Sequence, residues 1–243
     1  MSSTNFVLNA QPDRITLDAA RSAVIVVDMQ NDFGSPGGLF DRGGVDISMI
    51  RKAVEPTRKV LAAGRNAGMK IVYLKMGFRA DLSDLGAEDS VNRTRHLHFG
   101  VGQPTTSPDG SPGRFLVRDT WNTAILDELA PEPGDVELYK HRFSGFYETE
   151  LDRILRERGI RDLVFTGCTT CVCVDSTLRD AMFRDYRCVL LADCSGEPIG
   201  GDKSRSNHEA ALLTVQTLLG WVSDSESFLA AVKAYAGSAA RAS

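Results

Sequence analysis

The sequence lacks several features that mark specialised classes of protein. No apolar run approaches the length needed to span a bilayer, and the first residues lack the charged and apolar regions of a signal peptide. The net charge of -4 is small, and no basic cluster of the kind found in nucleic-acid-binding domains stands out. We therefore expect neither a membrane nor a nucleic acid as a partner.

Cysteine is scarce and odd in number, with five residues in 243. An odd count argues against a disulfide framework and favours the reducing cytoplasm as the location. Cys168 and Cys171 have the spacing of half a zinc site, but no second ligand pair of similar spacing follows. His96 and His98 likewise have no third ligand nearby. We expect no metal and no other cofactor.

Internal repeats, a linker and a second core are also missing, so a chain of 243 residues with 42% hydrophobic content is predicted to form one domain. Short apolar runs alternate with segments of helical periodicity. Strands are predicted at 23–27, 70–75, 135–139, 163–167, 187–192 and 221–223. This alternation predicts a three-layer α/β fold, in which helices cover both faces of a parallel sheet.

The predicted helices cover 46–67, 122–129, 149–158, a segment from 173 onward, 208–219 and a segment from 225 onward. Residues 1–17 have the composition of an extended arm with little core of its own. The segments 34–44 and 193–201 are predicted to be loops, and 76–115 a long loop region with at most short helices. The Ala/Gly/Ser-rich end is predicted to be a flexible tail. The core is expected between about 17 and 230.

The strongest functional signal lies in residues 163–177. A buried strand ends there at Gly167, and Cys173 stands where the next helix is predicted to begin. Unpaired backbone N–H groups and the positive end of a helix dipole favour thiolate over thiol at such a position. The alternative is an ordinary buried core residue, which is how we interpret the remaining cysteines, Cys168, Cys171, Cys188 and Cys194.

Two further polar residues follow predicted strands directly. Asp28 comes after 23–27, and Lys140 comes after 135–139. Taken alone, Asp28 could be a cap or turn residue and Lys140 a solvated surface charge. Because the carboxyl ends of parallel strands meet at one edge of a sheet, we expect both to lie beside Cys173. This convergence favours a catalytic site with Cys173 as its nucleophile.

Three motifs carry a resemblance to a known family: Val-Val-Asp-Met-Gln-Asn-Asp-Phe at 26–33, the block 140–146 and the block 167–174. From about 17 to 229, the chain resembles the isochorismatase-like cysteine hydrolase superfamily. Within it, the segments 140–146, 151–159, 176–180 and 220–228 are most similar to the ureidoacrylate amidohydrolases of pyrimidine degradation. The segment 79–85 is instead similar to biuret hydrolases.

The resemblance implies a six-stranded parallel sheet and a catalytic triad. By position, Cys173 is the nucleophile, Asp28 the base that takes its proton, and Lys140 a cation that stabilises the thiolate and the charged intermediate. It also implies a non-proline cis peptide bond, placed here between Thr169 and Thr170, and an oxyanion hole built from the N–H groups of Thr170 and Cys173. The nicotinamidase branch binds zinc through one Asp and two His residues after the second strand, and residues 75–84 contain no such set.

Substrate contacts are expected from a second group of residues, namely Phe33, Arg79, Arg142, Phe146 and Gln216. Arg95 is, with Arg79 and Arg142, a further candidate to pair with a substrate carboxylate, although surface arginines are most often merely solvated.

The function predicted from the sequence is hydrolysis of a C–N bond in a small ureido or carbamoyl compound of the ureidoacrylate type, through a covalent intermediate on Cys173. Biuret or triuret hydrolysis and the hydrolysis of N-carbamoyl amino acids are alternatives of the same chemistry. A non-catalytic binding protein is the alternative of a different class. We expect a homo-oligomer, a dimer or a tetramer, in the cytoplasm.

Overall fold

A computed structural model describes residues 5–239 and has a six-stranded sheet at its centre. The strand order is β10-β9-β8-β3-β4-β7, and every neighbouring pair is parallel. The strands are β3 (Ser22–Val27), β4 (Lys70–Met76), β7 (Val136–Lys140), β8 (Asp162–Cys168), β9 (Arg187–Gly196) and β10 (Trp221–Ser223). The predicted six-stranded parallel sheet is confirmed.

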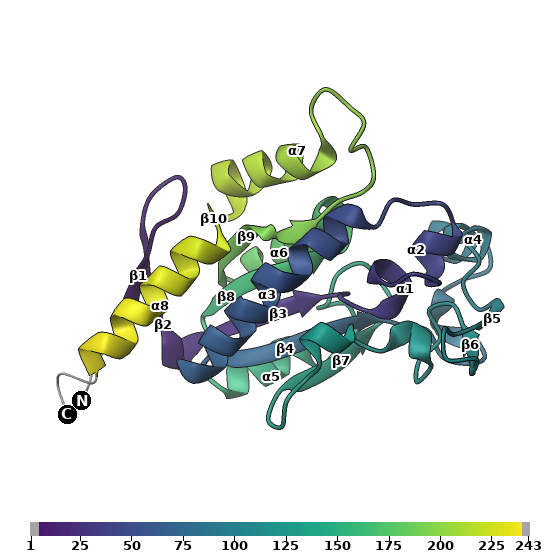
Figure 1. Ribbon diagram of the computed structural model, residues 1–243, viewed down its shortest axis with the longest axis horizontal. Helices are drawn as coiled ribbons and strands as arrows, with labels where there is room; N and C mark the ends of the chain where they lie inside the picture. The colour runs from purple at the N-terminus through teal and green to yellow at the C-terminus, as the bar shows by residue number, and fades with distance from the viewer. Residues whose placement is uncertain (1–4, 240–243) are drawn as a thin grey trace.

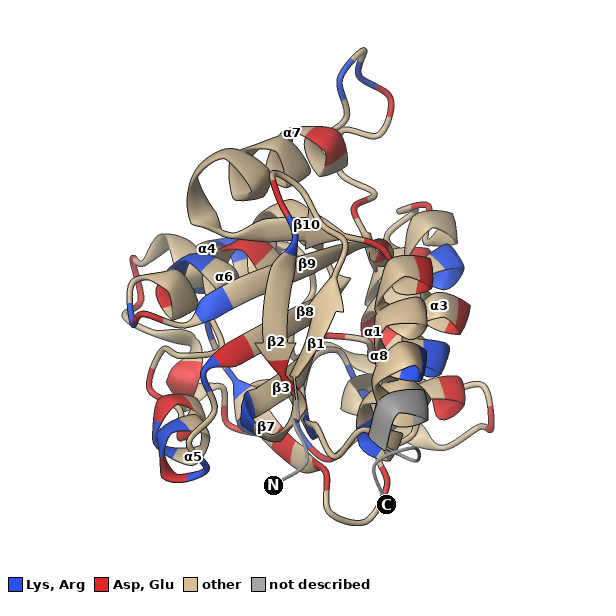
Figure 2. Cartoon of the chain, turned by 90° about the vertical axis from the view of Figure 1, so that its left-hand side faces the viewer, with Lys and Arg blue, Asp and Glu red and all other residues tan. Residues whose placement is uncertain are grey.

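Helices cover both faces of this sheet, and β3 shows why. Its alternate residues Val24 and Val26 belong to a core shared with α3 (Ser48–Asn66) and α8 (Ser225–Ala239). Ala23, Ile25 and Val27 point to the other face, where α5 (Leu151–Glu157) and α6 (Asp175–Met182) supply the partners. A central parallel strand is buried on both faces, which explains its unbroken apolar run. The three layers are visible in Figures 1 and 2.

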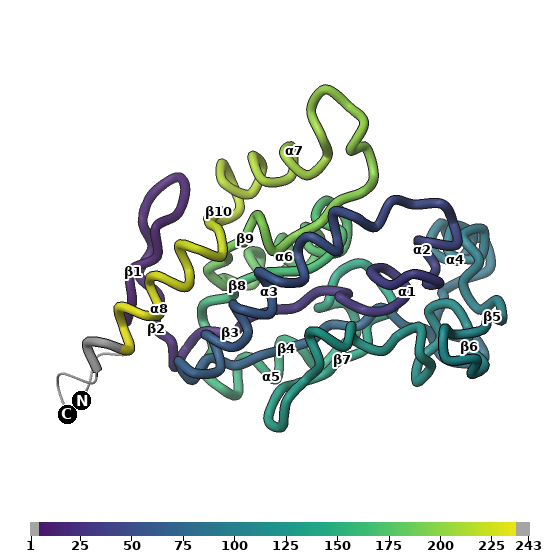
Figure 3. Tube along the Cα trace, viewed as in Figure 1, coloured from purple at the N-terminus to yellow at the C-terminus, as the bar shows by residue number. Residues whose placement is uncertain are grey.

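The amino-terminal segment is more structured than its composition predicts. It forms an antiparallel hairpin of β1 (Asn5–Leu8) and β2 (Ile15–Asp18), in which buried apolar residues alternate with more exposed ones. Phe6 packs its ring against Phe228 of α8, with the centroids 6.1 Å apart, and the hairpin lies beside α8 in Figure 3. The segment is extended as predicted, but the expected start of the core at about residue 17 was wrong, because Phe6, Leu8 and Ile15 belong to the main core. At the other end α8 continues to Ala239, and the rest of the predicted tail lies outside the described residues.

Several predicted loops contain short elements. The loop 34–44 contains the end of α1 (Asn31–Gly34) and all of α2 (Leu39–Arg42), and 76–115 contains η2 (Ser83–Leu85), α4 (Val91–His98), β5 (Pro104–Thr106) and β6 (Pro112–Arg114). The helix predicted at 122–129 is instead two separate turns, η3 (Trp121–Thr123) and η4 (Asp127–Leu129). Elements this short show too little periodicity to be recognised. In Figure 1, α1, α2, α4, β5 and β6 gather beyond the carboxyl ends of β3 and β4.

The remaining elements follow the prediction with shifted ends. The short turn η1 (Ala19–Arg21) precedes β3, and β9 continues four residues past its predicted end to Gly196. The last predicted helix before β10 is divided into α7 (Asn207–Thr214) and a π-helical turn, η6 (Val215–Leu219). Acidic and basic residues are interspersed along α3 and α5 (Figure 2). Within residues 5–239, no helix combines the length and the apolar character that crossing a bilayer requires.

Candidate active site

Asp28 is the residue at which the chain turns away from the central strand β3. Its N–H donates to the carbonyl of Leu74 at 2.8 Å, and its φ of 53° lies in the left-handed region. Residues other than glycine adopt this region rarely, and where they do the surrounding structure must hold them there. The turn leaves the Asp28 carboxylate fully buried at the carboxyl end of the sheet.

Lys140 ends β7 and forms an ion pair with Asp28. Its Nζ lies 2.8 Å from Oδ2 of Asp28, and both side chains are at most 1% exposed. The ammonium also donates to the carbonyl of Arg142 at 3.3 Å and lies 3.5 Å from the sulfur of Met76. An unpaired charge at this depth costs several kcal/mol, so each of the two groups stabilises the other in its charged form.

Cys173 joins this pair from a third direction. It lies in a π-helical turn, η5 (Thr170–Val174), which follows β8 and leads directly into α6. Its thiol lines the same cavity as Asp28, and Asp28 and Lys140 both lie near enough to shift its pKa. Gly167 allows β8 to approach β3 closely here: its φ is 116°, and a Cβ atom would lie 2.0 Å from the carbonyl oxygen of Val27. The structure thus brings together the three residues predicted to be catalytic.

The protonation of the site differs from what the helix-dipole argument predicts. Burial raises the pKa of the Cys173 thiol; Lys140 opposes this effect and Asp28 adds to it. Burial also raises the pKa of Asp28, against the pull of Lys140. Burial alone would lower the pKa of Lys140, but the negative charges of Asp28 and Cys173 outweigh it and raise that pKa. Burial therefore outweighs the effect of Lys140 and keeps the Cys173 thiol neutral in the resting site, while Lys140 stays charged.

The cis peptide bond lies one residue earlier than expected. It joins Cys168 to Thr169, because β8 continues to Cys168, which pairs with Gly196 of β9. Thr169 and Cys173 line the cavity described below, whereas Thr170 is buried behind it with its hydroxyl 2.9 Å from Nδ1 of His208. The predicted bond between Thr169 and Thr170 was wrong, and the oxyanion-hole roles of Thr170 and Cys173 stay predictions.

A cavity of about 500 Å³ opens above Cys173 and Asp28. Its volume lies in the usual range of ligand sites. Most of its walls are apolar, and Phe33 contributes as expected. The other apolar and aromatic lining residues are Leu39, Phe40, Val45, Met76, Phe99, Val101, Leu116, Phe143, Val172 and Ile199. The polar part of the wall includes Arg95, His96 and Thr169.

The other predicted substrate contacts lie away from this cavity. Arg142 donates from Nη1 to the carbonyls of Asp84 and His141, and Arg79 is exposed to solvent. Phe146 is buried in the core between the sheet and its α5/α6 layer, with its ring 5.9 Å from that of Tyr186. Gln216 lies on η6. Sequence position alone could not separate Phe146 in the core from Phe143, three residues earlier, in the wall.

Cys168 has a larger part in the site than a core cysteine would have. Its thiol donates to the backbone carbonyl of Asp28 at 3.2 Å, and the side chain lines the cavity. Cys188 and Cys194, in contrast, are buried in the core clusters away from the cavity. The interpretation of Cys168 as ordinary core filler was incomplete, since this thiol supports the left-handed turn at Asp28.

Asp32, on α1, is a second buried carboxylate close to Asp28, and no separate role for it was predicted from the sequence. Its oxygens accept N–H groups from Leu39 at 3.0 Å, Leu116 at 2.6 Å and the Asn122 side chain at 2.6 Å. Burial raises the pKa of Asp32 to about 6, although these donors pull it down. Leu39 and Leu116 line the cavity. Asp32 therefore holds two parts of the cavity wall together.

Two further polar side chains support the frame of the site. Gln30 donates to the carbonyl of Met76 at 2.9 Å and accepts the N–H of Met76 at 2.8 Å. Glu197 is fully buried and accepts the N–H groups of Cys171 at 2.8 Å and Ile199 at 3.0 Å. Their contacts join segments far apart in the chain, so nothing in the local sequence signalled them.

The histidines considered for metal binding serve other contacts. His96 is buried on α4, where its ring packs edge-on against that of Phe78. The centroid of the His96 ring lies 5.7 Å from that of Phe143. His98 packs against Phe99. Across residues 5–239, no three His, Cys, Asp or Glu side chains are grouped so that they could hold a metal ion.

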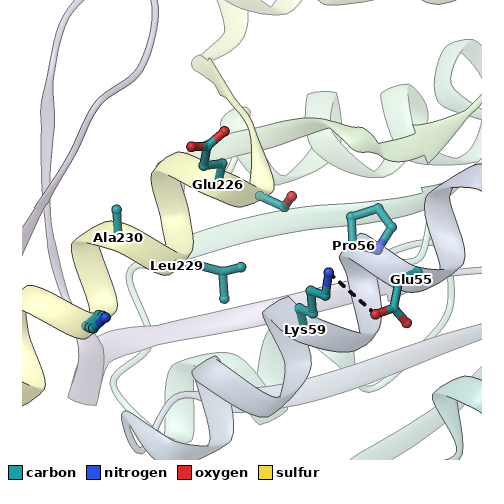
Figure 4. Close-up of a pocket in the computed structure, with 8 residues that line it drawn as sticks. Glu55, Pro56, Lys59, Glu226, Leu229 and Ala230 are labelled. Atoms are coloured by element: carbon teal, nitrogen blue, oxygen red, sulfur yellow. Dashed lines mark ion pairs between the residues drawn. The ribbon is translucent and has the colours of Figure 1, made fainter.

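A second depression, of about 450 Å³, lies between α3 and α8 (Figure 4). Charged residues line it, including the ion pair of Lys59 and Glu55 at 3.5 Å. It lies in the helix layer and contains neither a cysteine nor a histidine. Of the two cavities, the one above Cys173 is therefore the candidate active site.

The fold and the clustered cysteine, carboxylate and lysine define a class of α/β hydrolytic enzyme whose site lies at the carboxyl edge of a parallel sheet. Residues 22–227 match the family model described as the isochorismatase domain, which covers most of the chain. The protein therefore belongs to the isochorismatase family of hydrolases.

Solved structures of several relatives share this fold. A cysteine hydrolase from Pseudomonas syringae pv. phaseolicola 1448A is 30% identical, with a TM-score of 0.74 over 90% of this chain and 95% of that one. An isochorismatase family protein from Desulfovibrio vulgaris is 27% identical, with a TM-score of 0.68 over 89% and 98% of the two chains. The N-carbamoylsarcosine amidase from Thermoplasma acidophilum is 27% identical, with a TM-score of 0.62 over 85% and 97%.

Proposed function

We propose that this protein is a cysteine-dependent amidohydrolase that cleaves a C–N bond of a ureido or carbamoyl compound through a covalent intermediate on Cys173. The observation that carries the proposal is the buried pair of Lys140 and Asp28, 2.8 Å apart, beside the Cys173 thiol, whose pKa both residues influence. A nucleophile, a proton acceptor and a cation grouped at one point are the parts that covalent hydrolysis requires.

In the first half of the reaction, Asp28 takes the proton of Cys173 as the sulfur attacks the carbonyl carbon. An S–C bond forms, and Lys140 stabilises the negative charge. The C–N bond then breaks, and the leaving nitrogen takes the proton from Asp28. In the second half Asp28 accepts a proton from water while the water oxygen attacks the thioester carbon. The S–C bond breaks, the thiol regains its proton, and carbamate or the corresponding acid is released.

The similarity to an N-carbamoylsarcosine amidase supports carbamoyl chemistry in particular. Ureidoacrylate, biuret, triuret and N-carbamoyl amino acids all present a carbonyl flanked by nitrogen, so each is a candidate at this level. The five cysteines are all unpaired, which fits the reducing cytoplasm that we propose as the location. The homo-oligomer also stays a proposal.

Ammonia release from these four kinds of compound, measured with wild-type protein and with Cys173→Ser, tests the function. We expect turnover of at least one compound and a loss of more than about 10³-fold in Cys173→Ser, because a buried hydroxyl is a far weaker nucleophile than a thiol. Cys188→Ala is the matched control, because Cys188 is buried in the core without contacting the cavity. Retention of a few per cent of activity by Cys173→Ser would disprove the covalent role. Absence of turnover with every compound would favour a binding protein.

A further inference from the structure

We propose that the substrate carries a hydrophobic body, which fills the cavity above Cys173, and an anionic group, which pairs with Arg95. N-carbamoyl derivatives of amino acids with leucine-like or phenylalanine-like side chains have this chemistry. The inference rests on the proposed function and specifies its substrate class. It separates these compounds from small polar ones such as biuret.

The walls of the cavity set the first requirement. Beyond the reacting groups, aromatic and aliphatic side chains make up most of the lining, with Phe33, Phe40 and Phe143 among them. Biuret consists almost entirely of hydrogen-bonding groups, which lose water in such a place without finding partners. A hydrocarbon side chain loses no hydrogen bonds there and gains its transfer free energy.

The rim of the cavity leads to the same conclusion. Phe99 is 66% exposed, Ile199 52% and Phe143 44%, and all three line the cavity. They come from the segments that follow α4, β9 and β7, so three separate parts of the chain place apolar surface at one opening. An apolar rim of this kind is stabilised by a ligand that extends outward from Cys173.

Charge sets the second requirement. Lys140 is already paired with Asp28. Among the charged side chains of the cavity wall, this leaves the guanidinium of Arg95, which forms no side-chain hydrogen bond or ion pair within residues 5–239. Arg114 and Arg142, in neighbouring segments, both donate to backbone carbonyls. An uncommitted guanidinium at the opening can hold a carboxylate through two parallel hydrogen bonds.

His96 defines the third side of the site. Burial lowers the pKa of this imidazole, so it is neutral, and Nδ1 lies 2.6 Å from the carbonyl of Asn92. A carbonyl only accepts, so Nδ1 carries the proton and Nε2 is the acceptor nitrogen of the ring. A neutral acceptor suits the N–H groups of a ureido substrate, whereas a second anion would find no second cation in this part of the wall.

A substrate series tests the hydrophobic body. We expect kcat/KM to rise from N-carbamoylglycine to N-carbamoyl-leucine and N-carbamoylphenylalanine by roughly 10- to 100-fold, the value of burying one such side chain. Both enantiomers are assayed. Equal kcat/KM values across the series, or a preference for biuret, would overturn the inference while leaving the proposed function in place.

A pair of variants tests the anionic group. Arg95→Gln is expected to raise KM for N-carbamoylphenylalanine about tenfold, and to leave KM for 2-phenylethylurea, the analogue without a carboxylate, within twofold. Arg79→Gln is the matched control, because Arg79 is also exposed and lies outside the lining. Equal changes of KM for both compounds in Arg95→Gln would show that Arg95 does not bind a substrate carboxylate.

Binding separates this inference from the proposed function. Calorimetric titration of Cys173→Ser with the same series reports recognition without turnover, and its Kd values should fall in the same order. If that order holds while wild-type protein hydrolyses none of the compounds, the proposed chemistry is wrong and the ligand class stands. If the order is absent in Cys173→Ser as well as in turnover, the ligand class is wrong.

Discussion

Asp28 and Asp32 are two buried carboxylates four residues apart in the loop after β3, and their surroundings differ in kind. Asp28 faces the ammonium of Lys140 and the thiol of Cys173. Asp32 faces two backbone N–H groups and one side-chain amide, on three separate segments. Burial raises the pKa of both. The difference lies in whether the neighbours can exchange a proton.

A thiol is acidic enough to transfer its proton to a nearby carboxylate, whereas an amide N–H is far too weak an acid to do so. On the proposed mechanism, Asp28 changes its protonation during turnover, whereas Asp32 keeps Leu39 and Leu116 in position. If this distinction is correct, the same substitution at the two positions must affect different measurements. Asparagine, with nearly the same shape as aspartate, makes that comparison direct.

The largest effect is expected for Asp28→Asn, with a loss of about 10³-fold in kcat, since no proton acceptor remains for Cys173. Steady-state assays on the best substrate of the panel measure it, and circular dichroism checks the fold. Asp32→Asn should lose tenfold or less in kcat. Retention of more than a tenth of wild-type kcat by Asp28→Asn would show that another group acts as the base.

For stability, the larger effect is expected at Asp32. Asp32→Asn is expected to lower the free energy of unfolding by about 2 kcal/mol, because its amide turns N–H groups toward at least one of three N–H donors. Urea denaturation at pH 7 measures this loss. An unchanged midpoint would mean that Asp32 does not hold the loops together.

The loss in Asp32→Asn should depend on pH. With a folded-state pKa of about 6 against 3.8 for the ordinary carboxyl, Asp32 contributes stability that is complete below pH 3.8 and is lost as the pH rises to about 6. Wild-type protein regains part of this contribution at pH 5, and the variant cannot. The difference between the two proteins should therefore be about 1 kcal/mol larger at pH 5 than at pH 7.

Thiol reactivity gives a third comparison, around one sulfur atom. Lys140 lowers the pKa of Cys173 and Asp28 raises it, so Lys140→Ala should slow alkylation by iodoacetamide and Asp28→Asn should accelerate it. A shift of one pKa unit changes the thiolate fraction about tenfold. Stopped-flow rates across pH 5 to 9 measure the effect, with Cys173→Ser as the blank. Rates that move in the same direction in both variants would overturn the assignment of Asp28 as base and Lys140 as counter-charge.

The smallest effect is expected at Cys168. Cys168→Ala removes the thiol that donates to the carbonyl of Asp28, so kcat should fall by about two- to fivefold as the turn loosens. Cys188→Ala should lose stability without losing kcat, because its contacts lie in the core. Equal kcat values for both variants would return Cys168 to the status of a core residue.

The sequence predicted those parts of the molecule that repeat a regular pattern. The apolar run of β3 and the alternation of strands and helices are enough to place Asp28, Lys140 and Cys173 at one edge of a parallel sheet, because topology brings strand ends together whatever the side chains do. The short elements α1, α2 and α4 escaped prediction, since few turns of helix carry little periodicity.

The walls of the cavity could not be predicted for a related reason. Whether Arg95 or Arg142 faces the substrate depends on where α4 packs, and that position is fixed by contacts between distant segments, such as His96 with Phe143. The protonation of Cys173 depends on burial, which is a property of the packed structure. The position of Cys173 in the sequence suggests a helix dipole that favours the thiolate, but it does not show how completely the thiol is shielded from water.

The double hydrogen bond of Gln30 with the backbone of Met76 fixes the end of β4 beside the turn at Asp28. It copies the pairing of a peptide group, so the edge of β4 stays bonded beyond the point where Asp28 turns out of the sheet. Met76 in turn lies against the ammonium of Lys140. The entropy lost in bringing thiol, carboxylate and ammonium together is therefore incurred once, during folding, and not again in each catalytic cycle.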